Sequence, residues 1–110
     1  MRKEAATMSE PETALFVSTF RAKTGYERIL LHELQRLVRN TRREAECLFC
    51  DLYRLSVDPA VFSVHSVWSS RENWLSSGGW KNHPAGLGLL EQCLSEPIVI
   101  VTMEEVPEAA

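Results

Sequence analysis

Residues 47–68 read CLFCDLYRLSVDPAVFSVHSVW, and this stretch decides the fold that the sequence predicts. Cys47 to Leu55 and Ala60 to Trp68 are both rich in β-branched and aromatic residues, which is typical of strands. The Asp58-Pro59 pair between them indicates a turn. The sequence therefore predicts an antiparallel hairpin.

The segment before this hairpin predicts one strand and one helix. Residues Leu15 to Arg21 (LFVSTFR) have the composition of a strand. From Thr24 the apolar residues recur at helical spacing, and Thr24-Gly25-Tyr26-Glu27 has the pattern of a capping box, in which threonine and glutamate each satisfy an amide. The predicted apolar stripe consists of Ile29, Leu30, Leu34, Leu37, Val38 and Thr41.

The segment after the hairpin predicts an interrupted helix and a last strand. Ser69 to Glu72 offers a second capping box, and the helix that begins there is broken by Gly78-Gly79 and then Pro84. A helical stripe resumes from Leu87 to Leu94, and the β-branched run Pro97 to Glu104 predicts a strand.

The element order is strand, helix, strand, strand, helix, strand. This order is typical of the ferredoxin-like βαββαβ arrangement of the α+β class, with a four-stranded antiparallel sheet and both helices on one face. We expect one domain over residues 14–106, with frayed tails at 1–13 and 107–110.

Apolar residues occupy both faces of the predicted strands. One set consists of Phe16, Phe20, Leu48, Leu52, Phe62, Val64 and Trp68, and the other of Leu15, Val17, Phe49, Tyr53, Val61 and Val67. Because helices cover one face only, the second face predicts a homodimer closed sheet to sheet.

Composition and charge exclude several classes of partner. The 110 residues carry 12 Lys+Arg and 15 Asp+Glu, a net charge of −3, and lack the basic excess that nucleic-acid binding needs. The N-terminal residues have no signal-peptide core, and the longest apolar run, 98–101, cannot span a bilayer. We expect a cytoplasmic protein that binds neither nucleic acid nor membrane.

Three cysteines are present, and two of them form a C-x-x-C pair. On a regular strand Cys47 and Cys50 point to opposite faces, so the spacing disfavours a shared metal or disulfide. Together with Cys93 they are expected to act as small buried hydrophobic residues, with no metal site.

From Phe16 to Val101 the chain resembles the antibiotic biosynthesis monooxygenase family of dimeric α/β-barrel proteins. The order and spacing of several short elements carry the resemblance: Gly25, Arg42 or Arg43 with Glu44-Ala45-x-Cys47-Leu48, Phe62 with Trp68 and Ser70-Arg71-Glu72, Trp80-Lys81, and Glu96-Pro97. The resemblance implies oxidation of a phenolic or quinol-type aromatic with O2, without flavin, haem or metal, so the expected cofactor is none.

The chain departs from the family pattern at Glu46, Cys50, His65 and Ser66, and the segment between Trp68 and Trp80 is about three residues shorter. A haem-degrading branch of the family has an Asn in the first strand, a Trp and a His. Here Ser18 stands at the first position, Trp74 matches the second, and His83 lies one residue from the third. Haem degradation is therefore a lesser alternative.

His65 is the candidate proton acceptor, because imidazole titrates near neutral pH and the residue lies mid-strand. The alternative is a hydrogen-bonded histidine in the core or dimer interface. Tyr53 either donates its phenol to a bound quinone or lies in that interface.

Four further residues complete the predicted substrate site. Trp74 and Trp80 flank Gly78-Gly79 and form either a pocket wall, a lid or ordinary core. His83 contacts substrate or ends a helix, and Ser18 is a candidate contact from the first strand. Since a fold does not fix its chemistry, a non-catalytic small-molecule binding or regulatory protein remains the competing hypothesis.

Overall fold

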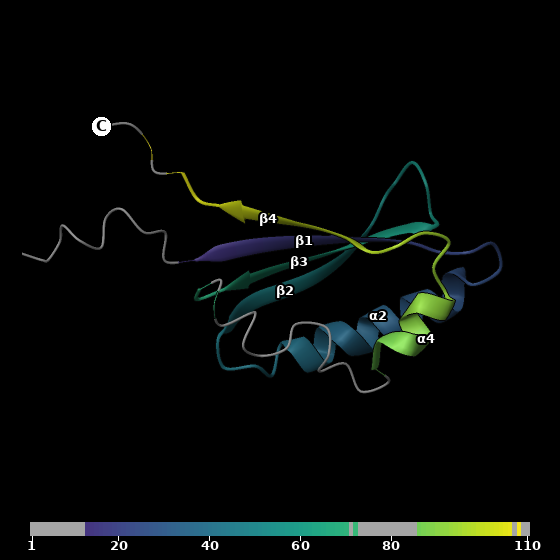
Figure 1. The fold of residues 1–110 in the computed structure, drawn as a ribbon, viewed down its shortest axis with the longest axis horizontal. Helices are drawn as coiled ribbons and strands as arrows, with labels where there is room; N and C mark the ends of the chain where they lie inside the picture. Colours follow the sequence, from purple (N-terminus) through teal and green to yellow (C-terminus); the bar gives the residue numbers. More distant parts are fainter. Residues whose placement is uncertain (1–12, 71, 73–85, 107, 109–110) are drawn as a thin grey trace, which may run out of the picture.

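The computed structural model describes residues 13–70, 72, 86–106 and 108, and its element order is the one that the sequence predicts. The elements are β1 (Ala14–Arg21), α2 (Glu27–Thr41), β2 (Cys47–Arg54), β3 (Val61–Trp68), α4 (Gly86–Gln92) and β4 (Val99–Glu104). The ferredoxin-like α+β prediction is confirmed (Figure 1).

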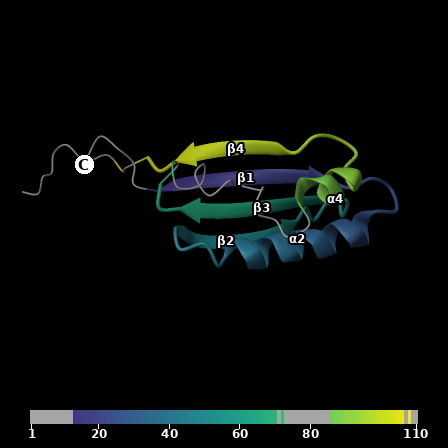
Figure 2. The same cartoon turned by 60° about the horizontal axis from the view of Figure 1, so that its bottom comes forward.

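The four strands form one antiparallel sheet in the order β2-β3-β1-β4. The predicted hairpin is the β2–β3 pair, while β1 lies in the middle and pairs with both β3 and β4. Helices α2 and α4 lie on the same side of the sheet, and no helix of the described residues lies on the opposite side (Figures 1 and 2). We name these two sides the helix-covered face and the open face.

The core lies between the sheet and the two helices. Phe20, Phe62 and Val64 of the strands are at most 1% exposed, and they belong to one cluster with residues of both helices. The helix residues of that cluster are Leu30, Leu34, Leu37 and Val38 of α2 and Leu90 of α4. The 3.6-residue spacing of the α2 stripe explains why a single face of this helix is buried.

The start of α2 differs from the predicted capping box. The helix begins at Glu27, and the capping residue Tyr26 makes no side-chain cap. The Gly25 amide donates to Glu27 Oε1 at 3.0 Å, so the glutamate reaches back as predicted but the threonine takes no part. Gly25 has φ +90°, a conformation that glycine adopts without the strain of a Cβ.

Two positions of the α2 stripe also differ from the prediction. Ile29 is 46% exposed, whereas Glu33 is buried. Glu33 lies 3.3 Å from Arg36 one turn later, and this charged partner offsets part of the cost of burying a carboxylate.

Of the second predicted capping box, Ser69, Ser70 and Glu72 are described, and the Ser69 hydroxyl donates a hydrogen bond to Glu46. The helix predicted after it lies mostly outside the described residues.

A bulge at the start of β2 corrects the prediction about the cysteine pair. Cys47 is paired with Trp68 and Phe49 with Val67, so the register shifts by one residue between them. Cys50 then pairs with Ser66, two residues from Trp68 on the same side of β3. Both Cys47 and Cys50 therefore lie on the helix-covered face, because an extra residue reverses the alternation.

Arg21 joins three segments at the end of β1. Its guanidinium donates to Asp58 Oδ2 at 2.8 Å in the β2–β3 turn and lies 3.5 Å from Glu96, which precedes β4. The hydrogen bond from Arg21 holds the pKa of Asp58 below its usual value.

No helix among the described residues is both long and apolar enough to cross a membrane.

Candidate functional site

The open face carries an aromatic pair at the centre of the β2–β3 hairpin. His65 lies in the middle of β3 and is half-buried, while Tyr53 of β2 is half-exposed. Their ring centroids are 4.7 Å apart with an interplanar angle of 52°. Tyr53 is opposite Ser63, which lies two residues before His65 on the same face of β3. Tyr53 is therefore the diagonal cross-strand neighbour of His65, and the two rings meet.

A charged pair lies beside these rings at the outer edge of the sheet. Asp51 is opposite His65 in the β2–β3 register. Arg42, just after α2, donates from Nη2 to Asp51 Oδ1 at 3.0 Å and from Nε to the Cys50 carbonyl at 2.8 Å. The guanidinium therefore neutralises the carboxylate closest in register to the imidazole, and it fixes the edge of β2.

The rest of the open face is mainly apolar. Among its large side chains, Phe49, Val99, Val101 and Met103 are 44–52% exposed. Leu15, Val17 and Val67 lie between them and are half-buried. His65 thus has the apolar Val17 on its β1 side and the Arg42-bound Asp51 on its β2 side. A mainly apolar face with a few polar groups suits a flat aromatic ligand.

Two buried hydroxyls lie on the helix-covered face. Ser66 Oγ accepts a hydrogen bond of 3.1 Å from Trp68 Nε1. Ser18 is fully buried, and its Oγ has no hydrogen-bond partner among the described residues. The serines separate the main core from a smaller apolar cluster of Ala14, Phe16 and Trp68.

The predicted site residues are therefore divided between the two faces. His65 and Tyr53 lie together on the open face, whereas Ser18 lies on the other side of the sheet. Trp74, Trp80 and His83 lie outside the described residues. One pocket in a single chain cannot hold both His65 and Ser18, because the sheet separates their side chains.

The pairing of Ser66 with Trp68 was missed at the sequence level. A signal was present, because residues two apart on a strand share a face and a buried indole N–H needs an acceptor. The serine is also one of the positions at which the chain departs from the family pattern.

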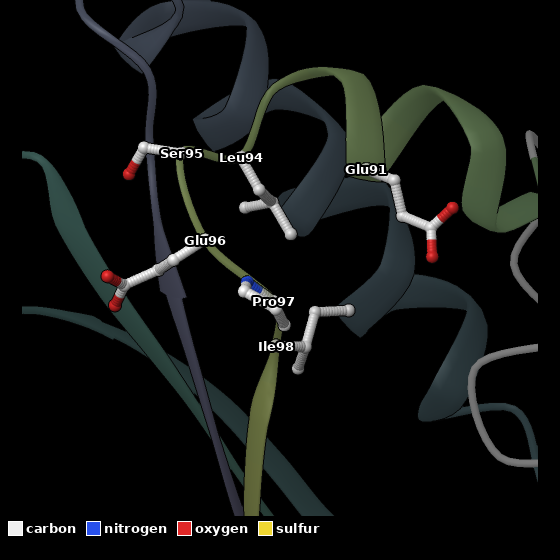
Figure 3. A pocket seen from close by; sticks show the side chains of 6 residues that line it. All are labelled: Glu91, Leu94, Ser95, Glu96, Pro97 and Ile98. Carbon is white, nitrogen blue, oxygen red and sulfur yellow. The ribbon is translucent and has the colours of Figure 1, made fainter.

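The surface hollow shown in Figure 3 lies at the α4–β4 connection and contains none of the predicted site residues. It has a volume of about 470 Å³ and is lined by Glu91, Leu94, Ser95, Glu96, Pro97 and Ile98. Glu96 turns toward β1 (Figure 3), and its Oε2 lies 3.5 Å from Arg21 Nε. This hollow is open to solvent. Of its two carboxylates, Glu91 is exposed to water and Glu96 is paired with Arg21.

Among the residues that the structure describes, the thiols and the other metal-ligating groups do not form a metal centre. All three cysteines are free, and burial raises the pKa of the Cys50 thiol to about 12. Burial also raises the pKa of Cys47 and of Cys93. Over residues 13–70, 72, 86–106 and 108, no three His, Cys, Asp or Glu side chains are placed to share a metal ion.

Comparison with known proteins assigns the chain to a family. The family model for antibiotic biosynthesis monooxygenase matches residues 15–85, well over half of the chain. No curated protein sequence matches the chain.

Solved structures share the whole fold at low sequence identity. A protein from Nitrosomonas europaea assigned to the antibiotic biosynthesis monooxygenases superposes with a TM-score of 0.80 at 12% identity, covering 88% of this chain and 93% of its own. Rv0793 from Mycobacterium tuberculosis gives 0.77 at 18% identity, with coverage of 89% and 99%. A third structure, an antibiotic biosynthesis monooxygenase, gives 0.77 at 23% identity, with coverage of 86% and 99%.

Proposed function

Since the chain belongs to the antibiotic biosynthesis monooxygenase family, we propose that it is a monooxygenase that oxidises a phenolic or quinol-type aromatic with O2 and needs no cofactor. One oxygen atom enters the ring carbon and becomes the new quinone carbonyl, and the other leaves as water. The two electrons and two protons that form this water come from the substrate. An electron-rich phenolate can itself pass an electron to O2, so the protein has to bind the ring and accept its proton.

The observation that carries this proposal is the His65–Tyr53 pair on an apolar face. The imidazole accepts the phenol proton and thereby raises the electron density of the ring. The Tyr53 ring, 4.7 Å from His65, offers a surface on which a planar substrate stacks. The apolar side chains around the pair would keep water away from the substrate anion once this face is covered.

We further propose that a second copy of the chain covers the open face and closes the site. The exposed apolar residues of β2 and β4 support this arrangement, because such a surface lowers its free energy when it is removed from water. In that dimer each His65 would lie between two sheets. Sedimentation of a monomer at micromolar concentration would contradict the arrangement.

The free thiols support a cytoplasmic location, because the reducing cytosol keeps cysteines unpaired.

Ser18 favours a second candidate, binding of a small molecule without turnover. Its buried hydroxyl has no partner among the described residues and lies between two apolar clusters. A ligand oxygen placed there would gain a hydrogen bond, but the neighbouring Ser66 and Trp68 cannot accept a proton from a phenol at neutral pH. Such a site would serve a binding or regulatory protein.

Oxygen uptake by the metal-free protein on a panel of hydroquinones and naphthols separates the two candidates. His65→Gln should lower kcat/KM by about a hundredfold or more, the usual contribution of a general base. His32→Gln is the matched control, since His32 is exposed on α2 far from the sheet face, and it should leave the rate unchanged.

Two outcomes decide between the candidates. Uptake that His65→Gln and His32→Gln leave equally intact would remove His65 from the mechanism. Binding of the panel without uptake, weakened by Ser18→Ala and untouched by His65→Gln, would select the binding protein instead.

A further inference from the structure

The outer strand β2 presents unpaired backbone groups. Leu55 N donates to the Val61 carbonyl, so in an antiparallel ladder alternate residues from Leu55 backwards bond to β3. The N–H and C=O groups of Leu52 and Arg54 then point away from the sheet. The Cys50 carbonyl belongs to the same outward set, and Arg42 Nε occupies it.

Helix α2 runs beside β2, the outermost strand at this edge (Figure 2). Two hollows lie here, and each is lined by residues of both elements. The first, of about 550 Å³, is lined by Glu27, Arg28, Leu31, Arg54, Asp58, Pro59 and Ala60. The second, of about 530 Å³, is lined by Gln35, Val38, Arg39, Arg42, Asp51 and Leu52. We call the two together the α2–β2 groove.

The charges along the α2–β2 groove are unbalanced in favour of cations. Its carboxylates are already engaged: Asp51 by Arg42, Asp58 by Arg21, and Glu27 by the Gly25 amide. Arg28 and Arg39 are exposed on α2 and have no ion pair within the described parts of the chain. Arg54 lies 5.3 Å above the Phe62 ring and likewise lacks a carboxylate partner there.

The two sides of the edge differ in character. Arg54 and Leu52 belong to the helix-covered face, next to the arginines of α2. Phe49 and Tyr53 belong to the open face and are about half exposed. A strand laid beside β2 would thus meet cations on one side and apolar rings on the other.

We propose that the α2–β2 groove binds an extended acidic segment of another protein, which adds to β2 as a fifth strand. Side chains of a strand alternate between faces, so acidic residues at every second position would face Arg28, Arg39 and Arg54. Apolar residues between them would continue the open face beside Phe49 and Tyr53. Backbone hydrogen bonds to Leu52 and Arg54 supply the anchoring, and charge complementarity selects the partner. The proposal is independent of the oxygenase chemistry.

The test uses the full-length chain and a fluorescent seven-residue peptide of alternating glutamate and valine. Fluorescence anisotropy should show binding that weakens as NaCl rises from 50 to 300 mM, because exposed charge pairs are screened by salt. The double variant Arg28→Ala/Arg39→Ala should raise the Kd about five- to tenfold, as expected for two exposed ion pairs. The control Lys23→Ala/Arg43→Ala removes the same charge outside the groove and should leave the Kd within about twofold.

Amide exchange measured by NMR supplies the second readout. The Leu52 and Arg54 amides should become protected when the peptide binds, whereas those of Asp51 and Tyr53, already paired with β3, should change little. A peptide with N-methylated amides at alternate positions should not bind. Equal weakening by both double variants, or binding without protection of Leu52 and Arg54, would overturn the proposal. Protection of both amides before the peptide is added would also overturn it, since a second copy would then occupy the edge.

Discussion

The two faces of the sheet are formed by the same strands, but their side chains are buried to different extents. Along β1, residues on the helix-covered face such as Phe16 and Phe20 are at most 1% exposed, whereas Val17 between them is only half-buried. The same alternation continues along β3, where Val64 is buried and His65 is not. Within the described residues, one apolar face of the sheet is therefore fully packed and the other stays partly exposed.

This difference indicates which face of the sheet contributes most to stability and which face is accessible to a ligand. A fully packed face contributes stability through burial and dispersion contacts, and it tolerates little change in volume. A half-buried face retains access for a ligand or a second copy. The candidate proton acceptor, His65, lies on the half-buried face. The Ser18 hydroxyl, which has no partner in the described part of the chain, lies on the fully packed face.

The largest expected effect comes from truncating the helix-covered face. Phe20→Ala should lower the free energy of unfolding by about 3–5 kcal/mol, because it leaves a cavity in the main core. Val17→Ala, three residues earlier on the open face, should cost about 1 kcal/mol or less in the monomer. Urea unfolding monitored by circular dichroism measures both. Equal losses would mean that the open face is packed as tightly as the core.

An intermediate effect is expected from the two buried serines. Ser66→Ala removes the acceptor of the Trp68 indole N–H and should cost about 1–2 kcal/mol. Ser18→Ala removes a buried hydroxyl that has no partner among the described residues, and it should be neutral or stabilising by up to about 1 kcal/mol.

Thermal unfolding of the two serine variants side by side makes the comparison. The substitution is chemically identical at both positions, so the difference between them isolates the hydrogen bond. A destabilised Ser18→Ala variant would show that this hydroxyl already has a partner in solution. That result would contradict the hypothesis that the Ser18 hydroxyl binds a ligand oxygen.

The smallest of these effects concerns the two cysteines of β2, which should differ in their rate of alkylation in the native protein. With a pKa of about 12, the Cys50 thiol is ionised to about one part in 10⁴ at pH 8, and its side chain is buried. Cys47 is half-buried on the same face and should react with iodoacetamide first. Mass spectrometry of the native protein should find label on Cys47 and almost none on Cys50.

The pH dependence of labelling sharpens this prediction. Burial raises the pKa of Cys47 as well, so its labelling rate should still be rising with pH above 9. Cys47→Ser should abolish the early label. Equal labelling of both thiols under native conditions would mean that the start of β2 opens readily.

Much of the fold could be predicted from short-range patterns. The β2–β3 hairpin follows from two β-rich runs around Asp58-Pro59, and α2 follows from its apolar stripe. The sequence also showed that apolar residues occupy both parities of β1, Phe16 and Phe20 on one and Leu15 and Val17 on the other, but it did not show which parity is buried. Strands and helices with strong periodicity can be predicted because their patterns involve residues only two to four positions apart in the sequence.

The departures arose where long-range contacts outweigh local pattern. Glu33 is buried and Ile29 exposed because the position of α2 over the sheet sets which side of the helix is covered. The bulge between Cys47 and Phe49 brings Cys47 to the face of Cys50, and it depends on how β2 meets β3. No local sequence rule encodes that register.

The candidate site shows the same division. The sequence by itself determined the βαββαβ order, the apolar character of both sheet faces and the choice of His65 and Tyr53, because periodicity and side-chain chemistry are properties of the chain. Only the tertiary structure decided that these two rings meet on the open face and that Ser18 lies across the sheet from them. The reason is that alternation places residues on two faces, whereas the packing of α2 and α4 selects which of the two is covered.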